Sequence, residues 1–217
     1  MIARSPSGAP QEIRAFEFES QTKPAAFALT HSPASLFPAG SEIYGQGEKA
    51  GSFYRVEFGA VRVYRLLSDG RRQISAFHLA GEMFGFEADA THHFFAEAIV
   101  STGIHVFCPS TGVDFSRELL PLALRGMTRA QEHLLVLGRQ NATERLAAFL
   151  VDMAERQGGL NEVELPMSRQ DIGDYLGLTI ETVSRIFSRL RAKGIIKLRG
   201  LRTIEIARLG TLEAMCE

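Results

Sequence analysis

The fold of this chain is restricted most by one stretch near its end, "MSRQDIGDYLGLTIETVSRIFSRLRAKGII". Ser168 followed by Asp171 is a capping signature for a helix start, and Gly177 ends that helix soon afterwards. Thr179 then caps a second helix. Gly173, midway along the first helix, allows the two helices to cross closely. The spacing predicts two short helices joined at a glycine turn, which is the helix-turn-helix arrangement.

Apolar residues support both helices. The residues that fit a hydrophobic staple at the two helix starts are Met167, Ile172, Leu178 and Val183. The residues on the buried side of the second helix are Val183, Ile186, Phe187 and Leu190. Gly194 ends this helix, and "IIKLRGLRTIEIA" then predicts two β-strands around Arg199 and Gly200, the sequence of a wing.

The charge is distributed unevenly along the chain. Residues 166–208 hold nine basic and four acidic residues, a net +5, while the whole chain has a net charge of -1, so the remainder carries -6. A locally basic end on a nearly neutral chain is typical of one nucleic-acid-binding module. A solvated basic surface would give the same count, so the charge supports the motif and does not establish it.

The free face of the second helix predicts the DNA contacts. We expect the bases to be read by Ile180, Glu181, Ser184 and Arg185, and the phosphates to be bound by Ser168, Arg169, Thr179, Thr182, Arg189 and Arg199. Arg185 can bond guanine O6 and N7 together, and Glu181 can accept from the cytosine amino group. Alternatively, Glu181 and Arg185 form a surface pair one turn apart, worth ~0.2–0.5 kcal/mol.

The chain divides into four predicted segments. We expect an N-terminal arm at residues 1–24, a β-roll at 25–112, a dimerisation helix at 113–138 and a winged helix-turn-helix at 139–217, an α+β organisation. Short alternating runs such as "SFYRVEFG", "AVRVYRLL" and "RQISAFHL", separated by glycines, predict an antiparallel β-sandwich or β-roll. In "AVRVYRLL", Val61, Val63 and Leu66 or Leu67 are expected to face a core, and "LLSDGRRQIS" predicts a hairpin.

Helical spacing follows the β region. The residues with a 4-3-4-3 spacing are Ala123, Met127, Ala130, Leu134 and Leu137, which form a seam like that of a coiled coil. The seam packs either on the chain's own sheet or on a second copy of the chain, and the C-terminal module favours a two-fold dimer. A further capped helix is predicted in "NATERLAAFLVDMAERQGG".

Several classes of protein are excluded by composition. The chain has no run of eighteen apolar residues and no apolar core of a secretion signal, so we expect it to be cytoplasmic, without a membrane contact. Its two cysteines, Cys108 and Cys216, are too few for a disulfide framework or an all-cysteine metal site. We expect no catalytic site, no metal and no bound cofactor.

At the residues of the second helix, the sequence resembles the Crp/Fnr family of bacterial transcription regulators, with most similarity to the FixK branch. The stretches that carry the resemblance are "GRQNATERLAAFLVDM", "MSRQDIGDYLGLTIETVSRIFSRLRAKGII" and "FHLAGEMFGFE". The resemblance implies a β-roll related to cyclic-nucleotide-binding domains, a long dimerisation helix and a winged helix-turn-helix. It also implies TTGA-like half-sites read by Glu181, Ser184 and Arg185, and a contact with RNA polymerase.

Two departures from the family pattern concern its ligands. The N-terminal arm has no cysteine for an iron–sulfur cluster, and the region after "GEMFGFE" has no arginine for a cyclic phosphate. His92 and His93 stand there instead, but adjacent residues on a strand point to opposite faces and would not share one metal ion.

These observations predict a homodimeric, sequence-specific transcription regulator that binds a palindromic DNA operator and acts as an activator. The alternative functions are an effector-responsive member whose roll binds a small ligand and a metal-dependent enzyme.

Overall fold

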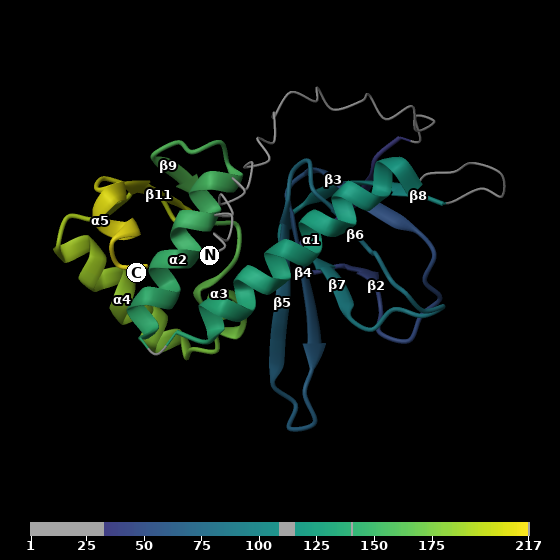
Figure 1. Ribbon diagram of the computed structural model, residues 1–217, viewed down its shortest axis with the longest axis horizontal. Helices are drawn as coiled ribbons and strands as arrows, with labels where there is room; N and C mark the ends of the chain where they lie inside the picture. Colours follow the sequence, from purple (N-terminus) through teal and green to yellow (C-terminus); the bar gives the residue numbers. More distant parts are fainter. Residues whose placement is uncertain (1–32, 109–115, 140, 217) are drawn as a thin grey trace, which may run out of the picture.

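The computed structural model describes residues 33–108, 116–139 and 141–216. Two lobes are joined by a long helix, α1 (Ser116–Leu137), that runs obliquely between them (Figure 1). The N-terminal lobe is built of β-strands, and the C-terminal lobe consists mainly of helices. The predicted arm at residues 1–24 and the predicted boundary between residues 112 and 113 lie outside the described residues. The three boundaries between the four predicted segments remain predictions.

The N-terminal lobe is an antiparallel β-roll of two four-stranded sheets. Its strands are β1 (Ser35–Phe37), β2 (Glu42–Tyr44), β3 (Phe53–Phe58), β4 (Ala60–Leu66), β5 (Arg72–Leu79), β6 (Met83–Phe84), β7 (Phe95–Ala98) and β8 (Thr102–Phe107). The strand orders are β1-β8-β3-β6 and β2-β7-β4-β5. Val56 and Ile104 from one sheet and Val61 and Ala96 from the other are completely buried in one apolar cluster. The roll core therefore lies between the sheets.

The predicted hairpin joins β4 to β5, and Gly70 in its turn has a φ of 81°. Val61 and Val63 face the core as predicted, but Leu66 and Leu67 are 51% and 39% exposed, so that part of the prediction was wrong. A register shift between Val63 and Tyr64 breaks the alternation. The end of the hairpin also projects beyond the roll, where no second sheet covers it (Figure 1).

The C-terminal lobe is a winged helix-turn-helix. Its elements are α2 (Ala142–Arg156), β9 (Glu162–Glu164), α3 (Arg169–Leu176), α4 (Ile180–Ala192), β10 (Ile196–Leu198), β11 (Thr203–Ile206) and α5 (Leu209–Glu213). Asn141 caps α2 by accepting from the Thr143 backbone N–H. The wing strands β10 and β11 pair as predicted, and β9 adds a third strand.

One hydrophobic core continues from the roll into this lobe. Ile74 and Phe77 of β5 belong to the same buried cluster as Leu146 of α2 and Ile172 of α3. Helix α3 consequently lies directly against β5, and the two lobes share an interior.

Candidate nucleic-acid interface

The helix-turn-helix has the local geometry that its sequence predicts. The Ser168 hydroxyl accepts from the Asp171 backbone N–H at 3.0 Å, and the Asp171 carboxylate accepts from the Ser168 backbone N–H at 3.0 Å. Gly177 ends α3 with a φ of 64°. A Cβ at Gly173 would lie 2.6 Å from the Leu178 carbonyl oxygen, so the crossing requires glycine there.

One face of helix α4 packs against the protein core, and the opposite face is exposed to solvent. The Thr179 hydroxyl caps its start by accepting from the Thr182 backbone N–H. The buried residues are the predicted four, Val183, Ile186, Phe187 and Leu190. The residues predicted to read bases, Ile180, Glu181, Ser184 and Arg185, are all exposed, as is Arg189. The structure thus brings the predicted base-reading residues together on one uncovered helix face.

Glu181 and Arg185 have different nearest partners on this face. The pKa of Glu181 lies below its usual value because its carboxylate accepts from its own backbone N–H and from the Thr179 hydroxyl, with the charge of Arg185 as the smallest cause. Arg185 Nη2 donates instead to the Thr182 hydroxyl oxygen at 3.2 Å. No ion pair within 4.0 Å joins Glu181 to Arg185 in the described residues, so the surface-pair interpretation is not supported by this geometry.

Arg169 is a half-buried cation at the first turn of α3. Its guanidinium carbon lies 3.1 Å from the centroid of the Phe187 ring, and burial lowers its pKa to about 10. It makes no ion pair with a carboxylate in the part of the chain that the structure describes. A partly dehydrated cation without a carboxylate is well suited to bind a phosphate.

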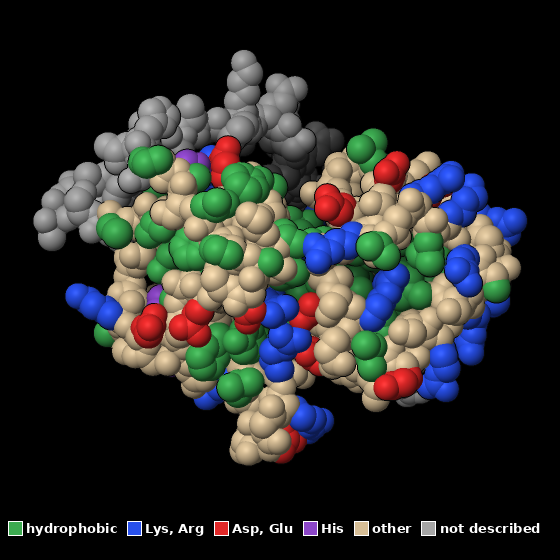
Figure 2. All heavy atoms as spheres, turned by 180° about the vertical axis from the view of Figure 1, so that it is seen from behind, with side chains coloured by type: hydrophobic (Ala, Val, Ile, Leu, Met, Phe, Trp, Pro, Cys, Tyr) green, Lys and Arg blue, Asp and Glu red, His purple; other side chains and the backbone are tan. Residues whose placement is uncertain are grey.

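Four other residues predicted to contact phosphates have intramolecular partners: Ser168, Thr179, Thr182 and Arg199. Ser168 donates to Asp171 at 2.7 Å, and the Thr179 hydroxyl donates to that of Thr182 at 3.2 Å. In the wing, Arg199 Nε donates to Glu205 at 2.6 Å, while Lys197 also contacts Glu205 at 2.8 Å. A phosphate would therefore have to share Arg199 with Glu205. Lys and Arg side chains gather along the outer rim of the C-terminal lobe (Figure 2).

Helix α1 has one face against the protein and one in solvent. Its inner face includes His133, which is buried, and Leu122 and Val136, which are half-buried. Two residues of the predicted seam lie on the outer side, where Met127 is 54% and Leu134 67% exposed. Ala130, also of the seam, lines a pocket together with His133. Ala130 is exposed, whereas Ala123 and Leu137 are half-buried. Leu120 and Leu124, which the sequence analysis missed, extend this stripe.

The roll interior does not fit a cyclic nucleotide. The rings of Tyr44 and His92 stack at 3.6 Å between centroids, and Tyr54 and Phe84 stack at 5.1 Å beside them. Residues 83–98 contain no Arg or Lys to bind a cyclic phosphate. Aromatic side chains therefore occupy the space between the sheets.

The two adjacent histidines have separate acidic partners. His92 Nδ1 lies 3.3 Å from Glu87, and His93 Nε2 lies 2.6 Å from Asp89. His92 is buried and His93 exposed, and both lie in the segment before β7 rather than in a strand. Within residues 33–108, 116–139 and 141–216, no three His, Cys, Asp or Glu residues gather in a way that could hold a metal ion.

The fold and the interface define a β-roll protein with a winged helix-turn-helix. A model of the Crp-like helix-turn-helix domain matches residues 144–215, and a model of the cyclic nucleotide-binding domain matches residues 35–108. The chain belongs to the Crp/Fnr family and is a FixK-like transcription regulator with a helix-turn-helix DNA-binding domain. Members of this family are dimeric regulators, not enzymes.

Individual relatives support this assignment. The nitrogen fixation regulation protein FixK of Rhizobium meliloti is 54% identical over 91% of this chain and 98% of its own length. FixK of Azorhizobium caulinodans is 41% identical over 86% of this chain and 80% of its own. The structure of FixK2 from Bradyrhizobium japonicum matches with a TM-score of 0.80 and 42% identity, covering 86% of this chain and 98% of that one.

Among the described helices, none is long and apolar enough to cross a membrane.

Proposed function

We propose that the protein is a homodimeric activator that binds a palindromic operator with TTGA-like half-sites. Ile180, Glu181, Ser184 and Arg185 read the bases in the major groove. The phosphate contacts come from Ser168, Arg169, Thr179, Thr182, Arg189 and Arg199. The observation that carries the proposal is the exposed polar face of α4, capped at its start and held from behind by four buried apolar residues.

The second copy of the chain binds through the outer stripe of α1. Leu120, Leu124, Met127 and Leu134 are each about half exposed or more in a single chain. A stripe of this kind on a long helix is stabilised by a matching helix, and a two-fold pair buries both stripes together. The dimer places one recognition helix at each of two half-sites about 34–36 Å apart.

The activator role implies a contact with RNA polymerase. The activator role itself is supported by a relative. A protein of Rhodopseudomonas palustris with the name transcriptional activatory protein AadR is 37% identical over 79% of this chain and 77% of its own length. The filled roll interior supports DNA binding without a cyclic nucleotide.

The experiment is a titration of purified protein, without added effector, against labelled duplexes that contain two, one or no TTGA half-sites. We expect tight binding to two half-sites and weak, salt-sensitive binding to the other two duplexes. Equal affinity for all three would contradict sequence-specific binding by a dimer.

A further inference from the structure

The contact between the roll and α3 contains a group of charged residues. Four of them, Arg62, Arg72, Asp171 and Asp174, join the roll to α3 and are here called the roll–α3 cluster, and Arg62 also pairs with Glu97 of β7. Arg72 donates to Asp174 Oδ2 from Nε at 3.0 Å and from Nη2 at 2.8 Å, and it also donates to Asp171. Arg62 Nη1 donates to Asp171 Oδ1 at 3.1 Å. Two arginines of adjacent roll strands therefore bind two carboxylates of the first helix of the helix-turn-helix.

Because its members are largely buried, the roll–α3 cluster tolerates little change in its geometry. The side chain of Asp171 is 4% exposed and that of Asp174 is 14% exposed, while Arg62 and Arg72 are 16% and 23% exposed. Partly buried ion pairs add little net stability, but separating the partners leaves an uncompensated charge out of water. The cluster therefore penalises a shift of α3 on the sheet more than it stabilises the fold.

The cluster acts on the start of the helix-turn-helix itself. Asp171 uses Oδ2 for the capping box with Ser168 and Oδ1 for the two arginines. Gln73, next to Arg72 on β5, donates from Nε2 to the Asp174 carbonyl oxygen at 2.8 Å. Side-chain and backbone contacts thus fix both the position and the direction of α3 on β5.

Helix α1 holds α3 from another side. The His133 ring stacks on the Tyr175 ring at 3.7 Å between centroids, and His133 Nε2 lies 2.9 Å from the Tyr175 carbonyl oxygen. Because α1 carries the proposed dimer face, α3 is fixed relative to the two-fold axis as well as to the roll.

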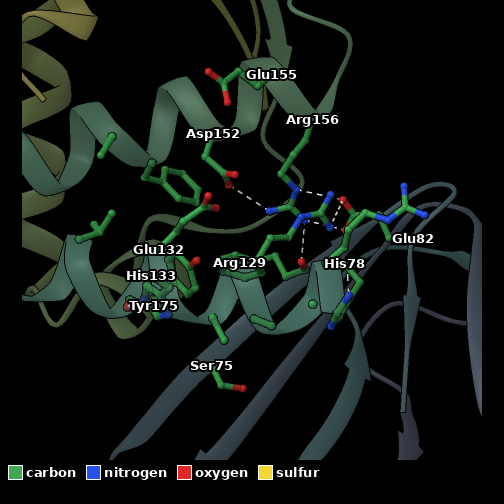
Figure 3. A pocket seen from close by; sticks show the side chains of 18 of the residues that line it. Ser75, His78, Glu82, Arg129, Glu132, His133, Asp152, Glu155, Arg156 and Tyr175 are labelled. Carbon is green, nitrogen blue, oxygen red and sulfur yellow. Dashed lines mark hydrogen bonds and ion pairs between the residues drawn. The ribbon is translucent and has the colours of Figure 1, made fainter. Parts of the chain in front are cut away.

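A second polar contact fixes α1 and α2 on the roll. Glu82, in the turn between β5 and β6, contacts Arg156 of α2 at 2.7 Å and Arg129 of α1 at 2.8 Å (Figure 3). Beside these groups lies a pocket of about 420 Å³, lined by residues including Ser75, His133 and Tyr175. The ionic contacts therefore add directional constraints to the apolar core that the two lobes share.

The recognition face takes no part in these contacts. Glu181, Ser184 and Arg185 remain exposed while α3 is docked. We propose that the roll–α3 cluster consists of positioning residues for DNA recognition, which set the half-site spacing that the dimer accepts without a small-molecule effector. This inference rests on the proposed function, since it requires a dimer that reads two half-sites.

The test measures affinity as a function of half-site spacing. Duplexes carry two half-sites at the preferred spacing, or with one or two base pairs added or removed, and full-length protein is titrated without effector. We expect Asp174→Asn to weaken binding at the preferred spacing by about 10-fold, within the range known for coupled neighbouring residues. Affinity at the altered spacings should change much less, so the preference for one spacing declines.

Three further variants separate positioning from loss of structure. Asp174→Glu, which keeps a carboxylate facing Arg72, should retain more of the spacing preference than Asp174→Asn. Gln73→Ala, which removes a single hydrogen bond to α3, should weaken the preference in the same direction but less. Arg71→Gln is the matched control, because Arg71 pairs with Asp69 on the same hairpin and is 77% exposed.

Each outcome has a distinct meaning. If Asp174→Asn and Gln73→Ala lower affinity equally at every spacing, or change nothing, the positioning inference is wrong although DNA binding stands. If wild-type protein has no preference for duplexes with two half-sites, the proposed function fails, and the inference fails with it.

Discussion

Glu181 and Arg185 lie one turn apart on α4, yet their intramolecular contacts differ. The ionised Glu181 carboxylate is stabilised by its own backbone N–H at the helix start and by the Thr179 hydroxyl. Arg185 donates a hydrogen bond to Thr182 and can extend into a groove. An acid beside DNA repels phosphates, but in the major groove it can accept from a cytosine amino group. Glu181 is thus expected to add base preference at some cost in overall affinity.

Substitutions at these residues should have distinct effects on base preference. Arg185→Ala should weaken operator binding by ~1–3 kcal/mol and flatten the preference for guanine, because a bidentate contact is lost. Glu181→Ala should retain or increase non-specific affinity while the preference at a cytosine-bearing position falls. Arg189→Ala should weaken binding to all DNA sequences alike. It should also reduce the slope of log affinity against log salt concentration by about one.

Titration against the operator and its single-base substitutions at two salt concentrations distinguishes these effects. Unchanged base preference in both Glu181→Ala and Arg185→Ala would rule out direct readout by this helix face.

His78, at the junction between the lobes, is expected to make the free energy of unfolding depend on pH. Burial, reinforced by the charges of Arg156 and Arg129 and opposed by Glu82, lowers the pKa of His78 from 6.5 to about 4. Between these values the unfolded chain binds a proton that the folded chain does not, so His78 makes stability fall as pH decreases. The expected slope is at most about 1.4 kcal/mol per pH unit from pH 6.5 down to about pH 4.

Urea unfolding at pH 7 and pH 5 checks this prediction. His78→Gln should lose less stability on acidification than the wild type, by ~1–2 kcal/mol. His93→Gln is the control, since the His93 side chain is half exposed. The same pH dependence in wild type and His78→Gln would show that His78 does not titrate as its surroundings require.

At the scale of elements, α1 is the component whose outer face is incompletely buried in one chain. Its inner residues contact α2 and α3, so substitutions on its outer stripe should leave the fold of the single chain intact. This separation lets dimer formation be tested without unfolding the protein.

A combined Met127→Glu and Leu134→Glu variant should sediment as a monomer and lose high-affinity operator binding, because two like-charged patches would face each other in the dimer. Leu160→Glu is a matched control, since Leu160 is 66% exposed and Leu134 67% exposed. A double variant that stays dimeric would place the dimer interface elsewhere.

Elements with strong local signals could be predicted from sequence. The Ser168 capping box, the Gly177 turn and the Asp69–Gly70 hairpin each depend on residues close in the chain. Strands β1, β6 and β7 have two to four residues, too few for a clear alternation, and α5 has only five. The prediction for Leu66 and Leu67 was wrong because the end of the β4–β5 hairpin projects beyond the roll, where no second sheet covers either residue (Figure 1).

In the candidate site, too, the local features could be predicted from the sequence and the long-range contacts could not. The exposed face of α4 follows from its apolar spacing and its cap. The partners of Asp171 did not follow, because Arg72 and Arg62 lie 99 and 109 positions away in the chain. From sequence, Asp171 has only the local role of a cap, and its contact with the roll depends on tertiary structure.

At the scale of the whole molecule, the roll, α1 and the helix-turn-helix share one interior and two sets of ionic contacts. The cluster on β4, β5 and α3 and the Glu82 contacts with α1 and α2 join the lobes within a single chain. The space between the roll sheets is filled by aromatic rings. Together these features favour a regulator whose recognition helices are already positioned for DNA.

The central claim is that this chain selects a two-fold DNA site as a dimer without a bound effector. The most direct measurement is selection of bound sequences from random duplexes with purified protein free of metal and nucleotide. The account predicts enrichment of paired TTGA-like half-sites with centres about one helical turn apart. Enrichment only after cyclic AMP or an iron–sulfur cluster is supplied, or enrichment of a single unpaired half-site, would contradict it.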